Sequence, residues 1–466
     1  MSTTQRWDAI VVGAGLGGML AAAILARRGR RVLVLERAAE VGGRLRSYEI
    51  DGYVIDAGAY LWPNLYLDQA LAAAGADGFR AAQIPAAQVL RVFVQGQGGR
   101  RFPFPWPGRG DAPALIEAAA TTLRADADTA RGLAALWERL AALSDAEVAA
   151  LRHVRMDGAL PRFGVDARVA DAFRRNLMLF GTYDPDSAPM ADCIGLRQRR
   201  LDGPQPKPEC PGPNAVGGVR ALPLALRAAL DAHGVELRLG WEVDQIDIDR
   251  QRAVGVVAHA MAQPFQQRLA ADAVVCNAPV WGLFALAAPR YFPPEFVADA
   301  RRCGAVGGVA AAAFAFDGLP SLRETGAPDT FPGWTRLLTG PAAAFGGGLL
   351  WATLHSPHNA PPGRHVLQAM RLSPHADLAD AERVRAIHDA FRAMLGEIYV
   401  DADARLLREW RWVTRDGSEY MIHSAPKPPV RAPGVERLFF VGESTDVPAI
   451  QMDAAALSAL RCAEMV

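Results

Sequence analysis

The chain of 466 residues has little lysine and no excess charge of either sign. Lys207 and Lys427 are its only lysines, although lysine and arginine together number 50. A reaction that needs an amine side chain therefore has two candidates. The 50 basic residues are balanced by 50 Asp and Glu. Nucleic acids bind proteins through clustered positive charge, so we expect no nucleic-acid partner.

Cysteine is scarce, and long apolar runs are interrupted. The five cysteines form no C-x-x-C pair, so we expect neither a disulfide framework nor a metal site, and a cytoplasmic location. The uncharged run 303–316 is too short to span a bilayer, and glycines break the run 338–357. We predict no transmembrane helix. Peripheral membrane contact and the oligomeric state are left open.

The first 36 residues have the pattern of a dinucleotide site. A short apolar strand, 8–12, leads into a glycine-rich turn, an Ala- and Leu-rich helix and a second apolar strand, 31–36. Gly13 permits the tight turn, Gly15 lets a pyrophosphate approach the backbone, and Gly18 lets the helix pack on the strand. Glu36 ends the second strand, where a carboxylate accepts ribose hydroxyls and disfavours a 2′-phosphate.

The glycine pattern leaves the kind of dinucleotide open, and the next segment narrows that choice. Residues 36–47 read E-R-A-A-E-V-G-G-R-L-R-S, and residues 52–59 read G-Y-V-I-D-A-G-A. With this pattern the sequence resembles the flavin-containing amine oxidase and phytoene desaturase superfamily. The strand and G-E turn at 438–445, the helix from 451 and the Asn277-Ala278-Pro279 segment also resemble that superfamily. Ser458-Ala459 departs from the Ser-Gly of many relatives, which weakens assignment to a subfamily.

The resemblance implies FAD bound without a covalent bond, since residues 401–412 contain no cysteine that could link a flavin. Arg44 would lie beside the pyrophosphate, Gly58 beside the isoalloxazine edge, and the backbone of Val243 near adenine. The residues that it predicts to contact FAD are Gly13, Gly15, Leu16, Gly17, Gly18, Glu36, Arg37, Gly43, Arg44, Gly58, Ala59, Val243, Gly442, Glu443, Gln451, Met452 and Ala455.

The same reading predicts an α/β fold with two interleaved domains. A Rossmann-type FAD-binding domain of the kind found in GDI and p-hydroxybenzoate hydroxylase would comprise residues 1–60, 214–280 and 433–466. A discontinuous, mixed α+β substrate domain would comprise residues 61–213 and 281–432. The residues of this predicted substrate domain are richer in Pro, Trp and Phe than those of the FAD-binding domain.

The sequence indicates the cofactor more clearly than it indicates the reaction. Residues 180–189 resemble phytoene desaturase and retinol saturase relatives, so we expect desaturation or dehydrogenation of a largely apolar small molecule by hydride transfer to flavin N5. Oxygen, a quinone or another compound would accept the electrons. Candidate pocket residues are Trp410, Trp412, Tyr420 and His423. The alternatives are an amine oxidase that releases peroxide, a non-redox isomerase that uses FAD, and a non-enzymatic lipid-binding protein of the GDI type.

Overall fold

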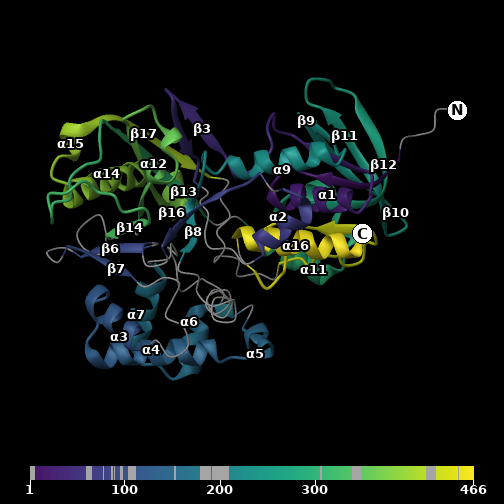
Figure 1. Cartoon of the computed structure of the whole chain (residues 1–466). Helices are drawn as coiled ribbons and strands as arrows, with labels where there is room; N and C mark the ends of the chain where they lie inside the picture. The colour runs from purple at the N-terminus through teal and green to yellow at the C-terminus, as the bar shows by residue number, and fades with distance from the viewer. Residues whose placement is uncertain are drawn as a thin grey trace.

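The computed structural model describes residues 6–58, 66–76, 78–85, 88, 90–94, 98–102, 112–151, 154–178, 190–191, 209–304, 307–337, 348–415, 427–449 and 451–466. Two seven-stranded sheets form its framework. In the view of Figure 1 the first sheet and its helices lie on the right and the second sheet on the left, with a group of helices below it.

The first sheet brings together strands that are far apart in the sequence. Its parallel part has the order β9 (Glu236–Leu239), β2 (Val32–Glu36), β1 (Arg6–Val12), β12 (Gln266–Cys276) and β18 (Leu438–Phe440). The long strand β12 continues into an antiparallel ribbon with β11 (Arg252–Ala260) and β10 (Trp241–Asp249). The predicted strands at 8–12 and 31–36 correspond to β1 and β2.

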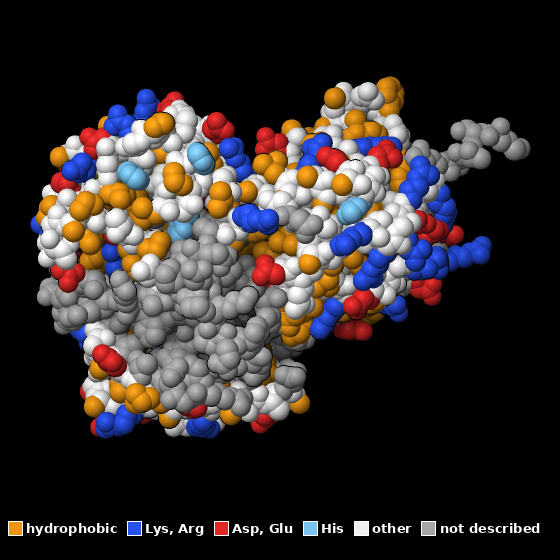
Figure 2. Space-filling model, viewed as in Figure 1, with side chains coloured by type: hydrophobic (Ala, Val, Ile, Leu, Met, Phe, Trp, Pro, Cys, Tyr) orange, Lys and Arg blue, Asp and Glu red, His pale blue; other side chains and the backbone are white. Residues whose placement is uncertain are grey.

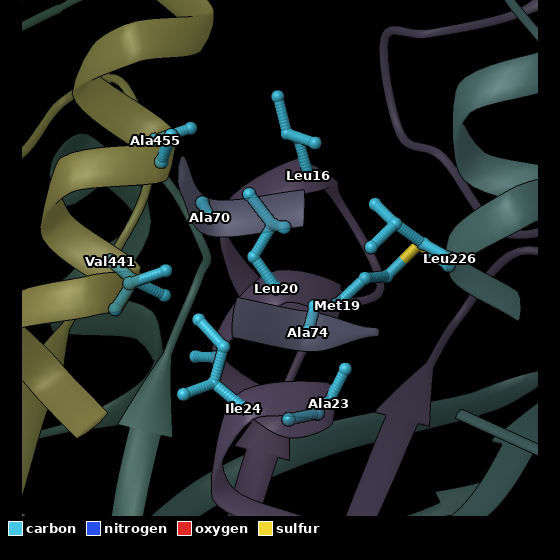
Figure 3. Close-up of a cluster of buried hydrophobic side chains, with 14 of the residues drawn as sticks. Leu16, Met19, Leu20, Ala23, Ile24, Ala70, Ala74, Leu226, Val441 and Ala455 are labelled. Atoms are coloured by element: carbon cyan, nitrogen blue, oxygen red, sulfur yellow. The ribbon is translucent and has the colours of Figure 1, made fainter. Parts of the chain in front are cut away.

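Helices cover one face of this sheet. Helix α1 (Leu16–Arg27) lies between α2 (Leu67–Ala74), α9 (Ala221–Ala232) and α16 (Gln451–Met465). Ile24 of α1 points toward Val441, and Met19 lies against Leu226 of α9 (Figure 3). Residues 16–25 of α1 are all buried, which explains why its sequence is apolar on every side.

Alternate residues of the same strands form a second buried cluster on the other face. The short elements η4 (Val280–Gly282), α10 (Leu283–Leu286) and η5 (Pro289–Tyr291), and helix α11 (Pro294–Arg302), contribute to this cluster. Phe296 of α11 stacks on Phe440 of β18 with ring centroids 6.1 Å apart. Residues 280–303 therefore pack on the first sheet.

The second sheet is mixed, with the order β17 (Leu406–Thr414), β13 (Gly307–Phe316), β16 (His365–Pro374), β15 (Gly348–Trp351), β14 (Trp334–Leu337), β6 (Leu90–Val94) and β7 (Gly98–Phe102). Helix α14 (Ala381–Ile398) packs on one face through Phe391 and Leu395. On the other face lies the hairpin of β3 (Ser47–Ile50) and β4 (Tyr53–Asp56). There β13 presents Ala313 and Ala315, whose small side chains leave room for Tyr53 and Ile55.

The remaining helices form a separate group below the second sheet in Figure 1. They are α3 (Ala112–Thr122), α4 (Ala127–Ala141), α5 (Asp145–Ala150), α6 (Met156–Ala159), η2 (Leu160–Phe163) and α7 (Ala167–Met178). Trp137 and Phe173 are buried in their core, which also includes Trp334 of β14. Strands β5 (Ala81–Pro85) and β8 (Glu209–Ala215) form a separate two-stranded ribbon. The other short elements are α12 (Ala352–His355), η7 (Pro357–Asn359), α13 (His375–Ala379) and α15 (Ala402–Arg405).

The strands of the first sheet all come from residues 1–60, 214–280 and 433–466, and those of the second sheet from residues 61–213 and 281–432. Helix α2 and residues 281–303 nevertheless pack on the first sheet. The exact domain boundaries stay a prediction.

The outer surface agrees with the neutral composition. On the face shown in Figure 2, basic and acidic side chains are interspersed. None of the helices in the described part of the chain has both the length and the apolar character that a membrane span requires.

Candidate functional site

Four adjacent parallel strands of the first sheet end at the same edge. Their order, β2, β1, β12, β18, places Glu36, Gly13, Asn277 and Gly442 next to one another. Ligands of open α/β sheets bind outside the carboxyl ends of the strands. The topology therefore locates the candidate site at this edge.

The first turn is shaped by close backbone contacts that exclude side chains. Gly13 has a φ of +95°, a conformation that glycine adopts without strain. A Cβ on Gly18 would lie 2.2 Å from the Gly13 carbonyl oxygen, and a Cβ on Gly17 would lie 2.7 Å from the Gly442 nitrogen. Helix α1 begins at Leu16 with no acidic residue in its first turn. Its first N–H groups, which have no acceptor within the helix, suit an anion.

Glu36 is held in place by the backbone around it. Its two carboxylate oxygens accept hydrogen bonds from the Ala14 nitrogen at 2.7 Å and the Ala38 nitrogen at 2.8 Å. Each carboxylate oxygen has a further lone pair that can accept a ribose hydroxyl. Arg37, the next residue, is exposed.

A second loop closes over the first. The Gly42 nitrogen donates to the Ala14 carbonyl oxygen at 2.8 Å, and a Cβ on Gly43 would lie 3.3 Å from Cα of Gly15. Arg44 then forms an ion pair with Glu443, with 2.8 Å between nitrogen and oxygen. Three turns thus meet, and the Arg44–Glu443 ion pair joins the second turn to the third.

The third turn rests on helix α16. The Gly442 nitrogen donates to Ser458 Oγ at 2.9 Å, so this serine holds the G-E turn against the helix. The helix starts at Gln451, whose φ is +51°, and Met452 and Ala455 follow in its first turns. Asp453 accepts hydrogen bonds from the Tyr66 and Leu67 nitrogens at 2.7 and 3.0 Å, and so caps helix α2.

Asn277 is the site residue that the sequence analysis did not select. Its side chain lies against Gly13, Gly15, Gly17, Gly18 and Gly442, and its Oδ1 is 3.0 Å from the position of a Cβ on Gly442. The available signal was its place directly after an apolar strand. Only the strand order, with β12 between β1 and β18, shows that this place is central.

The D-x-G segment brings the second sheet to the site. A Cβ on Gly58 would lie 3.3 Å from Val309 of β13. The Ala57 carbonyl oxygen accepts hydrogen bonds from Trp412 Nε1 at 3.0 Å and Thr414 Oγ1 at 3.1 Å. The predicted pocket residue Trp412 is thus bonded to the backbone beside Gly58.

Asp56 is a buried acid in the same segment. Its carboxylate accepts from Ser47 Oγ at 2.6 Å and from the Val219 nitrogen at 2.9 Å. Burial raises the pKa of Asp56 to about 6, and the hydrogen bonds from Ser47 and Val219 offset part of that rise. The acid ties β4 to the glycine turn before α9.

Other predicted residues lie further from these turns or outside the described residues. Val243 is buried on β10, in the same cluster as Leu33 and Leu35 of β2. Trp410 packs on Tyr53, with ring centroids 5.4 Å apart. Ala59, Tyr420, His423 and Lys207 lie outside the described residues. Lys427 is near Cys303: burial raises the pKa of that thiol to about 11, and the ammonium acts in the opposite direction.

The converging turns fit a dinucleotide. Glycines stand wherever a Cβ would fill the space between the turns, the start of α1 and Arg44 suit a pyrophosphate, and Glu36 suits a ribose. The sequence profile of the family described as flavin containing amine oxidoreductase matches residues 16–466. The chain belongs to this family.

The relatives that are similar to this chain include a desaturase and an isomerase. It is 28% identical over 298 residues to hydroxyneurosporene desaturase of Rubrivivax gelatinosus, which is 58% of this chain and 53% of the relative. It is 43% identical over 82 residues to the chloroplastic prolycopene isomerase of Daucus carota, which is 16% of this chain and 13% of the relative. These matches span about half or less of the relatives' lengths.

The structure also resembles wild-type putrescine oxidase bound to putrescine, with a TM-score of 0.67 and 17% identity. The match covers 99% of both chains. At this identity the similarity establishes the fold, and the predicted fold class is confirmed. Membership of the family gives the protein FAD as its cofactor and makes it an enzyme of the flavin oxidoreductase type. The absence of a covalent flavin bond and the individual cofactor contacts stay predictions.

Proposed function

We propose that the protein desaturates or dehydrogenates a largely apolar small molecule. The observation that carries the proposal is the uncharged strand beside Gly58. Strand β13 has no ionisable side chain over its whole length, and its Val309 packs against Gly58. All ten residues of β13 are buried, so the protein wall behind Gly58 is apolar and carries no charge that would favour a charged substrate.

In this proposal the chain supplies position and dryness. FAD, when bound, would supply a hydride acceptor at N5, and oxygen, a quinone or another compound would be the final electron acceptor. Glu36 orients the adenosine end, and the N–H groups at the start of α1, with Arg44, hold the pyrophosphate. Helix α16 contacts the G-E turn through Ser458, and the N–H groups at its start would stabilise negative charge on the flavin. Trp412 and Val309 exclude water from the Gly58 side.

The relatives are consistent with this substrate class, because the desaturase and the isomerase are both named for carotenoid compounds. The fold is also that of an enzyme bound to a diamine. A protonated amine that leaves water needs an opposite charge or hydrogen-bond acceptors to offset the cost of its desolvation. The side chains that contact Ala57 and Gly58 are instead an indole, a hydroxyl and a valine, and the nearby Asp56 carboxylate is already bonded to Ser47 and Val219.

Anaerobic bleaching of the flavin tests the proposal. Purified protein is mixed without oxygen with acyclic polyenes, ring-type apolar compounds and amines, and the visible flavin bands are followed. We expect bleaching by an apolar compound, with a product that has one more double bond. Bleaching by amines alone, with peroxide released on aeration, would contradict the proposal and identify the protein as an amine oxidase.

Two further outcomes also contradict it. Activity that appears only after chemical reduction of the flavin, with no net change in substrate oxidation state, would identify an isomerase. Colourless protein that cannot be reconstituted with FAD would indicate a lipid-binding role. A Gly17→Ala variant, which narrows the glycine turn, is the control for bleaching by any flavin bound elsewhere. The cytoplasmic location stays a prediction.

A further inference from the structure

The backbone that leads into Gly58 is held by side chains of the second sheet. Two donors converge on the Ala57 carbonyl oxygen, Trp412 Nε1 and Thr414 Oγ1. The preceding carbonyl oxygen, of Asp56, accepts a hydrogen bond from Gln368 Nε2 at 3.1 Å. Three donors from β16 and β17 therefore bind two successive carbonyl groups.

Asp56 and Ala57 are also hydrogen-bonded, through other atoms, to segments of the predicted FAD-binding domain. The Asp56 carboxylate accepts from the Val219 nitrogen before α9, and the Ala57 nitrogen donates to the Arg46 carbonyl oxygen at 2.9 Å. Arg46 follows the loop that carries Arg44. Residues 56 and 57 thus connect the loop over the first turn to the second sheet.

Strand β17 is itself fixed from its other side. His388 of α14 donates from Nε2 to the Ala311 and Trp412 carbonyl oxygens, at 3.0 and 3.3 Å. Thr414 pairs with Val309 in the ladder between β17 and β13, and Val309 is the residue that packs on Gly58. The donors to Ala57 and the apolar contact to Gly58 therefore belong to one anchored region of the sheet.

We propose that Trp412 and Thr414 are positioning residues that set where the flavin-facing backbone at Gly58 lies relative to the substrate side of the protein. They act through the Ala57 carbonyl group, so their effect reaches the flavin through the backbone. This assignment rests on the proposed function only in placing Gly58 at the flavin. It does not depend on which substrate is oxidised.

The indole of Trp412 then has a different role from the one expected for a pocket residue. Its N–H group is engaged by the backbone, and its ring packs in the cluster with Tyr53 and Ile55. Replacement by phenylalanine keeps a ring in this cluster and removes the donor. Replacement of Thr414 by valine removes the second donor and keeps the branched shape.

The test uses the FAD-bound full chain and the variants Trp412→Phe, Thr414→Val and their combination. The first measurement is amide hydrogen exchange in the peptide 47–58. We expect exchange to rise on the order of tenfold in the double variant, because two hydrogen bonds that fix this segment are lost. The second measurement is the visible flavin spectrum and midpoint potential, which we expect to shift.

The matched control is the double variant Trp137→Phe and Thr121→Val in the helical group. Trp137 Nε1 donates to Asn176 at 3.1 Å and Thr121 Oγ1 donates to the Glu117 carbonyl oxygen at 2.8 Å, so the same two kinds of donor are lost elsewhere. We expect neither the local exchange nor the flavin signals to change in this control.

Two results would overturn the assignment. One is wild-type exchange in peptide 47–58 of the double variant. The other is faster exchange with an unchanged flavin spectrum and potential, which would leave the two residues a purely structural role. If Trp412→Phe does not fold, Thr414→Val alone decides by the same criteria. Failure of every apolar compound to bleach the flavin would refute the proposed function and leave these readouts intact.

Discussion

At the scale of single residues, Glu36 joins two tasks in one carboxylate. It accepts from the Ala14 nitrogen inside the glycine turn and from the Ala38 nitrogen in the following loop. Burial of this carboxylate is compensated by those two hydrogen bonds. The shape of the turn and the recognition of ribose therefore depend on the same side chain.

Replacement of Glu36 by alanine should weaken FAD binding by about tenfold or more, because hydrogen bonds to a charged group are each worth roughly 1.5–3 kcal/mol. Titration of the apoprotein with FAD, followed by flavin fluorescence, measures this. Glu40→Ala, which removes an exposed carboxylate from the same loop, should bind FAD as the wild type does. Equal affinity in the Glu36 variant would refute the ribose assignment.

Asp56 should make stability depend on pH in a direction unusual for an acid. Its pKa in the folded protein is about 6, above the ordinary 3.8. The folded state therefore holds a proton that the unfolded chain releases, and this contribution to stability is present below about pH 4 and lost as pH rises through 6. Relative to Asp56→Asn, the wild type should lose on the order of 2–3 kcal/mol over this interval. Urea unfolding at a series of pH values tests this, and a constant difference between the two proteins would contradict it.

At the scale of elements, the start of helix α1 is limited by the turn after β18. A Cβ on Gly17 would lie 2.7 Å from the Gly442 nitrogen and 2.9 Å from Asn277 Oδ1. Backbone cannot yield at such distances without moving the helix or the G-E turn. Two segments of the cofactor site are thus packed to backbone contact.

We expect Gly17→Ala to lower FAD affinity by roughly five- to a hundredfold, since overpacking typically costs about 1–3 kcal/mol. Its control is Gly396→Ala in helix α14, where nothing lies within 4 Å of the added Cβ. That control should bind FAD normally and gain about 0.5–1 kcal/mol of stability. FAD titration and urea unfolding of both variants decide, and normal affinity in Gly17→Ala would contradict the packing argument.

The elements themselves were largely predictable, and their contacts were not. Apolar runs of the correct length predicted β1, β2 and β18, and the glycine turn predicted the start of α1. Local sequence contains no information on strand order, so it could not show that Asn277 would lie against Gly13 and Gly442. It likewise showed Trp412 as an aromatic residue of a strand, and could not show which carbonyl group its indole would meet.

At the scale of the whole molecule, a buried ion pair joins distant parts of the second sheet. Arg91 of β6 binds Asp329 through two hydrogen bonds of 2.9 and 2.8 Å. Asp329 also accepts from Tyr399 at the end of α14 and from Trp351 of β15. Burial favours the neutral acid, yet the Arg91 guanidinium holds the pKa of Asp329 below its ordinary value.

Removal of one partner should therefore destabilise the protein strongly. Asp329→Asn leaves the Arg91 charge buried and unbalanced, and we expect a loss of about 3–5 kcal/mol in the free energy of unfolding. Asp272→Asn breaks the exposed ion pair with Arg6, and should change the free energy of unfolding by less than about 1 kcal/mol. Urea unfolding followed by tryptophan fluorescence compares the two. Similar small losses in both would show that the buried network contributes little.

The order of strands in the first sheet also has a consequence for biosynthesis. Strand β18 pairs with β12 at Val274 and Leu438, and Glu443 meets Arg44 across almost the whole sequence. A nascent chain that has already folded its first strand, helix and strand still lacks one wall of the cofactor site until β18 and α16 have left the ribosome. Such non-local contacts form slowly. We therefore expect FAD to be loaded only after β18 and α16 have emerged, and earlier intermediates to expose the apolar surface of α1 that α16 later covers.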